Sequence, residues 1–124
     1  MKRRILIVED NADLRRLYAI GLNLRGYEVR LAANGAEAID RVETEKPDLV
    51  ILDLCMPVMD GWQFIDRLNP QGAPETVPIL VITGHDKPTD RIIPPCVRGW
   101  LAKPASIDEV AVKLTEITLP PASH

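Results

Sequence analysis

Short apolar runs that alternate with helix-like patterns constrain the fold of this chain more than any other feature of its sequence. We expect strands at residues 5–8, 27–32, 49–52, 79–82 and 100–102. Helical spacing of apolar residues predicts helices from residue 12 to the turn at Gly26, over 36–45, over 61–68, and from a Ser106/Glu109 capping box to Pro120. Strands separated by helices need crossover connections, which predicts a doubly wound parallel sheet with helices on both faces.

The connection between the fourth and fifth expected strands departs from this regular pattern. A helix belongs there, but Pro88, Pro94 and Pro95 leave only residues 89–93 free for it. A proline inside a helix removes a backbone hydrogen bond and its ring clashes with the preceding turn. We therefore predict an α/β fold with an irregular fourth helix.

The size and composition of the chain fit one small domain. Its 124 residues are 46% hydrophobic and 27% charged, which is an ordinary globular balance. Only 4% of the residues are aromatic, so the core must be mainly aliphatic. We expect a single domain over residues 1–119 and a short C-terminal tail over 120–124.

The charge, the cysteines and the first residues narrow the class of protein. The net charge of -3 at pH 7 gives no sign of the basic face that binds nucleic acid. Cys55 and Cys96 are too few for a disulfide framework, so we expect reduced thiols in a cytoplasmic protein. The first apolar run is cut off by Glu9, and no run reaches the length of a membrane span. We therefore expect no direct nucleic-acid partner and no membrane.

Polar residues follow four of the five expected strands. Glu9 and Asp10 follow the first strand, and Asp53 follows the third. Thr83 ends the fourth strand, and Lys103 follows the fifth. The carboxyl ends of parallel strands meet at one edge of the sheet, where ligands of such folds bind. We therefore expect these side chains to converge there.

Three carboxylates at one edge repel one another unless a cation joins them. Mg²⁺ is the best candidate, because it binds a few carboxylates together with waters and a phosphate oxygen. Lys103 would add a positive charge for a phosphoryl oxygen, and Thr83 would add a hydroxyl donor. These groups around a carboxylate nucleophile are the parts that phosphoryl transfer requires.

Each of these residues taken alone also has an ordinary interpretation. An acidic pair after a strand is often a helix cap or a solvated turn, and Asp53 could be a turn residue. Thr83 could cap a helix, and Lys103 could be a surface charge. The combination is more specific than its members, because four separate strand ends must agree.

Four segments of the chain resemble the receiver domain of two-component response regulators. They are residues 5–11 (ILIVEDN), 53–61 (DLCMPVMDG), 83–85 (TGH) and 103–104 (KP). The resemblance extends from about residue 2 to residue 116. It implies a five-stranded, flavodoxin-like sheet of strand order 2-1-3-4-5 in a (βα)5 arrangement.

The resemblance implies a role for each polar residue at the expected sheet edge. Asp53 would accept a phosphoryl group from a phosphohistidine on a sensor histidine kinase or a histidine phosphotransfer protein. The Mg²⁺ ligands would be Asp10, Asp53, the backbone carbonyl of Cys55, and Glu9 directly or through water. Lys103 would pair with the phosphoryl group, and Thr83 would move to hydrogen-bond to it.

The resemblance also assigns roles to residues around this set. Trp100 stands at the position of an aromatic switch residue that fills the space behind Thr83 after phosphorylation. Cys55 and His85 occupy positions that set the lifetime of the phosphorylated state, and the Lys103–Pro104 peptide bond is implied to be cis. An ordinary half-buried aromatic and ordinary loop residues are the alternatives for Trp100, Cys55 and His85.

These observations lead us to expect a phosphorylatable signalling switch rather than an enzyme, with an unidentified downstream protein or effector domain as its output. One alternative is a pseudo-receiver that binds partners without phosphorylation, which the interrupted fourth helix favours. Another is a phosphatase of the haloacid dehalogenase type. That family needs a second Asp as general acid two residues after the nucleophile, and Cys55 stands at that position here. The sequence does not separate a stand-alone receiver from one end of a hybrid kinase or a longer regulator.

Overall fold

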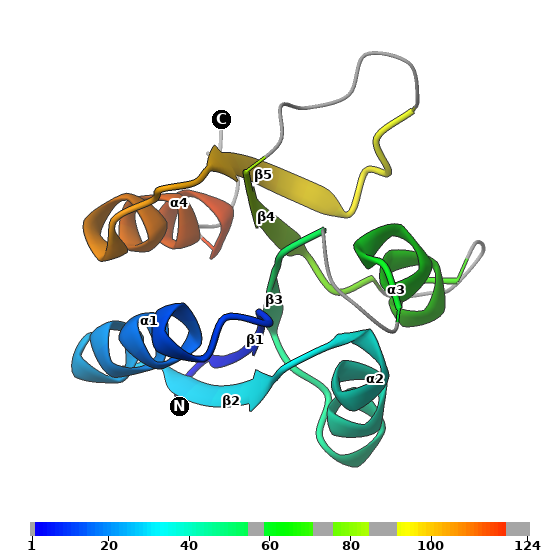
Figure 1. Cartoon of the computed structure of the whole chain (residues 1–124), viewed down its shortest axis with the longest axis horizontal. Coiled ribbons are helices and arrows are strands. Elements are labelled where there is room, and N and C mark those ends of the chain that lie inside the picture. The colour runs from blue at the N-terminus through cyan, green and yellow to red at the C-terminus, as the bar shows by residue number, and fades with distance from the viewer. Residues whose placement is uncertain (1, 55–58, 71–75, 85–91, 119–124) are drawn as a thin grey trace, which may run out of the picture.

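The chain folds into a five-stranded parallel sheet with helices on both faces (Figure 1). The computed structural model describes residues 2–54, 59–70, 76–84 and 92–118. The strands are β1 (Arg4–Val8), β2 (Glu28–Ala32), β3 (Leu49–Leu52), β4 (Ile79–Thr83) and β5 (Val97–Ala102). The helices of the described part are α1 (Ala12–Leu24), α2 (Gly35–Thr44), α3 (Gly61–Leu68) and α4 (Ile107–Thr118). The strand order β2-β1-β3-β4-β5, parallel throughout, confirms the predicted doubly wound α/β fold.

The connection between β4 and β5 is irregular where the structure describes it. Residue 84 and residues 92–96 form no helix, and residues 85–91, which include Pro88, lie outside the described residues. The helix labelled α4 is therefore the one that follows β5. β5 itself begins at Val97, three residues before the predicted start, since its first residues are a mixed and partly exposed edge segment rather than an apolar run.

Two apolar layers hold the helices against the sheet. α1 and α4 cover one face, on which Tyr18, Leu22 and Leu114 are buried together with alternate residues of the inner strands. α2 and α3 cover the other face, where Phe64 and Ile65 are buried (Figure 1). Every residue of β3 and β4 is buried, as expected for central strands that are covered on both sides. No helix in the described ranges has the length and apolar character needed to cross a lipid bilayer.

Side-chain caps fix where several helices begin. The Asn11 side chain accepts a hydrogen bond from the backbone of the first turn of α1. Asp60 and Gln63 form a reciprocal capping box at the start of α3. Ser106 and Glu109 make the predicted reciprocal bonds ahead of α4, at 3.1 and 3.3 Å. Asn11 and Asp60 thus fix the starts of α1 and α3, the helices that follow β1 and β3 along the chain.

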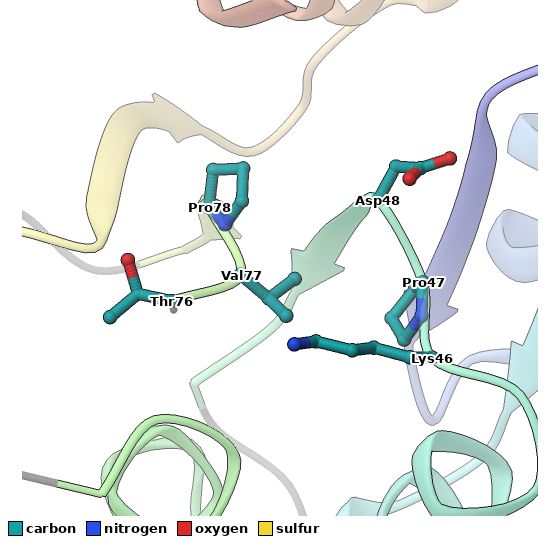
Figure 2. A pocket seen from close by; sticks show the side chains of 6 residues that line it. All are labelled: Lys46, Pro47, Asp48, Thr76, Val77 and Pro78. Atoms are coloured by element: carbon teal, nitrogen blue, oxygen red, sulfur yellow. The ribbon is translucent and has the colours of Figure 1, made fainter. Parts of the chain in front are cut away.

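A surface hollow of about 450 Å³ lies at the opposite edge of the sheet, at the amino ends of β3 and β4. Its lining residues are Lys46, Pro47, Asp48, Thr76, Val77 and Pro78 (Figure 2). Figure 2 shows the Lys46 side chain extended toward Val77. Because all strands are parallel, this hollow is separated by the length of the sheet from the residues that follow the strands.

Candidate functional site

Three carboxylates converge at the carboxyl ends of β1 and β3. The parallel register sets Val8 beside Leu52, and the backbone N–H of Asp53 donates to the carbonyl of Val8 at 3.0 Å. The residues that follow the two strands are therefore neighbours. Carboxylate oxygens of Glu9, Asp10 and Asp53 all lie within 4.8 Å of one another. Glu9 and Asp53 are buried, whereas Asp10 is exposed to solvent.

Lys103 enters this cluster from the end of β5. Its Nζ lies 2.7 Å from Oε1 of Glu9 and 2.9 Å from Oδ2 of Asp53. The backbone N–H of Lys103 donates to the carbonyl of Thr83 at 2.8 Å, which ties the end of β5 to the end of β4. The Lys103–Pro104 peptide bond is cis. The ammonium thus bridges two buried carboxylates from different strands.

Burial and ion pairing perturb the protonation of the cluster in defined directions. Burial raises the pKa of Glu9, and the hydrogen bonds from Lys103 and from the backbone of Asn11 only partly offset this. Burial alone would lower the pKa of Lys103, but the two carboxylates raise it further, so the net shift is upward. Lys103 therefore remains positively charged at neutral pH.

The cluster has the charge and the donor atoms that suit a divalent cation. When all four groups are ionised, three carboxylates against one ammonium leave two negative charges unbalanced. A hard cation with oxygen ligands, such as Mg²⁺, compensates this charge and tolerates a ligand open to water, as Asp10 is. The residues present therefore fit Mg²⁺.

Thr83 contributes a hydroxyl at the adjacent strand end. Its side chain is fully buried, and its Oγ1 has no hydrogen-bond partner among the described residues. A buried polar group without a partner typically costs about 1–3 kcal/mol. Such a group is rare in a folded protein and calls for an explanation, such as a water, an ion or a functional role.

Trp100 lies on the sheet face covered by α3. It pairs in register with Val81 and is partly buried. Its ring packs against that of Trp62 on α3, with ring centroids 6.4 Å apart and planes tilted by 36°. The sequence singled out Trp100 but not this partner, because pairing between a helix and a strand far apart in the sequence leaves no local signal.

Two predicted site residues, Cys55 and His85, lie outside the described residues. One side chain close to the cluster was not predicted from the sequence. Arg15 of α1 donates from Nη1 to the backbone carbonyl of Glu9 at 2.7 Å. Its position one turn after the Asn11 cap could have suggested a contact with the preceding loop.

Comparisons with known proteins agree with this geometry. The family described as "Response regulator receiver domain" matches residues 5–115. Among curated relatives, "Response regulator MprA" of Mycolicibacterium vanbaalenii is 34% identical over 116 residues, covering 92% of this chain and 49% of that protein. The protein of the same description from Mycobacterium tuberculosis H37Rv is 33% identical, covering 92% of this chain and 50% of that protein. The chain thus spans about half the length of these relatives.

Solved structures show the same architecture. The chemotaxis response regulator CheY4 of Vibrio cholerae superposes with a TM-score of 0.83 at 29% identity, covering 94% of this chain and 99% of that one. The receiver domain of the hybrid histidine kinase CckA gives a TM-score of 0.75 at 34% identity, covering 91% of this chain and 96% of that one.

Proposed function

The chain belongs to the response regulator receiver domain family of two-component systems, and from this premise we propose that Asp53 accepts a phosphoryl group in the presence of Mg²⁺. The observation that carries the proposal is the convergence of Glu9, Asp10 and Asp53 within 4.8 Å, with Lys103 bonded to two of them. Asp53 is the member at the centre of the sheet, after β3. Receiver domains are signalling domains rather than classical enzymes, and this one would change its own state.

The transfer step requires little covalent chemistry from the protein. A carboxylate oxygen of Asp53 forms a bond to phosphorus while the bond between phosphorus and an imidazole nitrogen of the donor breaks, and that electron pair leaves with the imidazole. When bound, Mg²⁺ supplies positive charge that offsets repulsion between the carboxylate and the phosphoryl oxygens. Its proposed ligands are Glu9, Asp10, Asp53 and the backbone carbonyl of Cys55.

Lys103 and Thr83 respond to the new phosphoryl group. Lys103 already contacts Oδ2 of Asp53, so a short movement brings its ammonium to a phosphoryl oxygen. Thr83 carries a buried hydroxyl that lacks a partner among the described residues, and it donates to another phosphoryl oxygen. The phosphoryl group replaces the single negative charge of the carboxylate with nearly two and brings strong acceptor oxygens, which favours a second arrangement of this strand end.

Trp100 and two loop residues complete the proposed switch. Trp100, next to Val81 on the neighbouring strand, changes its packing when Thr83 moves. Cys55 and His85 tune the lifetime of the aspartyl phosphate. The proposed donor is a histidine kinase or a histidine phosphotransfer protein, and the proposed output is a downstream protein or effector domain met in the cytoplasm.

Phosphorylation with a small donor tests the proposal. The purified chain is incubated with Mg²⁺ and acetyl phosphate or phosphoramidate, and its intact mass is measured. We expect a gain of one phosphoryl group in the wild type and none in Asp53→Asn. Asp48→Asn is the matched control, because Asp48 is exposed and lies at the other end of β3.

The other outcomes identify the alternatives. A folded wild-type chain that gains no phosphoryl group from either donor would be a pseudo-receiver. Sustained turnover of small phosphoesters would indicate a phosphatase.

A further inference from the structure

Arg15 binds the backbone of the loop that carries two of the three carboxylates. It lies in the first turn of α1, directly after this loop, and is partly buried. Its guanidinium donates from Nη1 to the carbonyl of Glu9 at 2.7 Å and lies 3.5 Å from the carbonyl of Asp10. A bond from a charged donor is stronger than one between neutral groups. Arg15 thus holds the acidic loop by its backbone carbonyls.

Other bonds secure the amide groups of the same loop. The backbone N–H of Glu9 donates to the carbonyl of Ala32 at 3.1 Å, and that of Asn11 donates to Oε2 of Glu9 at 3.1 Å. These bonds hold β1 to β2 and shape the turn, but they leave Asp10 itself at the exposed tip. The Asp10 carboxylate lies within 4.8 Å of the two buried carboxylates, and like-charge repulsion disfavours this close position. The bonds from Arg15 to the backbone carbonyls act against a shift of the loop away from it.

We propose that Arg15 is a positioning residue for the cation site, which sets the backbone carbonyls of Glu9 and Asp10 so that the Asp10 carboxylate stays beside Asp53. The proposal rests on the proposed function only in taking the cluster as a Mg²⁺ site. It concerns binding of the metal alone and needs no phosphoryl donor.

The direction in which the Mg²⁺ affinity changes when Arg15 is removed distinguishes a positioning role from a purely electrostatic one. A cation near a negatively charged cluster repels Mg²⁺, so its removal should strengthen Mg²⁺ binding if charge alone matters. Loss of a positioning contact weakens binding instead, and partners of metal ligands typically contribute about 10- to 100-fold in affinity. Arg16 provides the matched control, since it is adjacent and exposed and makes no hydrogen bond or ion pair within the described residues.

The test is a titration of Mg²⁺ into the full chain by isothermal calorimetry, with the free energy of unfolding measured in parallel. We expect Arg15→Ala to raise the dissociation constant for Mg²⁺ about 10-fold. Arg15→Lys should recover part of this loss, because an ammonium reaches a carbonyl but lacks the planar fork of donors. Arg16→Ala should leave the affinity unchanged or improve it slightly.

Several results would overturn the proposal. Unchanged or tighter Mg²⁺ binding by folded Arg15→Ala is one, and a wild-type chain that binds no Mg²⁺ is another. A lower stability with an unchanged dissociation constant would assign Arg15 a purely structural role. If Arg15→Ala fails to fold, Arg15→Lys and Arg15→Gln decide the question by the same titration. A chain that binds Mg²⁺ with this dependence on Arg15 but gains no phosphoryl group would refute the proposed function and leave this inference standing.

Discussion

Replacing Lys103 by Met should destabilise the protein in a way that Mg²⁺ reverses. The substitution keeps an apolar stem of similar length but removes the ammonium that bonds to Glu9 at 2.7 Å and to Asp53 at 2.9 Å. The two carboxylates have side-chain exposures of 4% and 6%, so water cannot replace the lost partner fully. Three carboxylates would then face one another without a compensating charge.

The size of the effect follows from this burial. Removing one member of a buried ion pair typically costs about 3–5 kcal/mol. The Lys103 side chain is 26% exposed, and partial contact with solvent weakens its interactions, so we expect a loss of about 2 kcal/mol without Mg²⁺. Under the proposed function, Mg²⁺ would bind only the folded cluster and would restore the missing positive charge. It should therefore stabilise Lys103→Met more than it stabilises the wild type.

Urea unfolding with and without Mg²⁺ measures both the loss of stability in Lys103→Met and the stabilisation of this variant by Mg²⁺. Lys113→Met is the matched control, because Lys113 forms an exposed pair with Glu116 at 3.5 Å within α4, worth only about 0.2–0.5 kcal/mol. A loss in Lys103→Met that matches the control, or one that Mg²⁺ leaves unchanged, would refute the assignment of Lys103 and the carboxylates to one cation-binding cluster.

Four further substitutions test the fold and the aromatic pair. Tyr18→Phe removes a buried 3.0 Å hydrogen bond to the carbonyl of Ala105 and should cost about 1–2 kcal/mol. Burial raises the pKa of Tyr18 above its ordinary value of 10.0, so the unfolded chain releases this proton more readily than the folded chain. The stability advantage over Tyr18→Phe is complete below pH 10.0 and should be lost as the pH rises through the pKa of the folded state, as alkaline denaturation curves would show. Gly61→Ala would bring a Cβ within 2.6 Å of Leu54 Cα and should lose about 1–3 kcal/mol in urea unfolding, whereas Gly84→Ala, whose added atom meets no atom of the described residues within 4 Å, should be nearly neutral. Trp62→Phe leaves Trp100 as the single tryptophan, and its emission should change when beryllofluoride binds with Mg²⁺; constant emission would exclude Trp100 from the switch.

The sheet and the acidic cluster could be predicted because each depends on local sequence and on one general rule. Apolar runs mark buried strands, and parallel strands carry the residues after their carboxyl ends to one edge. Glu9, Asp10, Asp53 and Lys103 therefore came together as predicted. The start of β5 was wrong by three residues, since an edge strand that is half exposed has no apolar run to mark it.

The contacts that could not be predicted depend on side-chain direction across the fold. The bond from Arg15 to the Glu9 carbonyl requires one particular arginine conformation over a capped turn. The packing of Trp62 on Trp100 depends on how α3 lies against β5. The bond from Arg15 spans only six residues, so the position of Arg15 one turn after the cap could have suggested it, whereas the packing of Trp62 on Trp100 joins elements whose relative position only the complete fold defines.

Direct location of the phosphoryl group tests the central claim most directly. After incubation with Mg²⁺ and acetyl phosphate, borohydride reduces an aspartyl phosphate to homoserine, and tandem mass spectrometry of peptides locates that residue. We expect homoserine at position 53, dependent on Mg²⁺ and absent from Asp10→Asn if the cluster acts as one site. Homoserine at Asp10 or elsewhere, or labelling of Asp53 that is indifferent to Mg²⁺, would contradict the account.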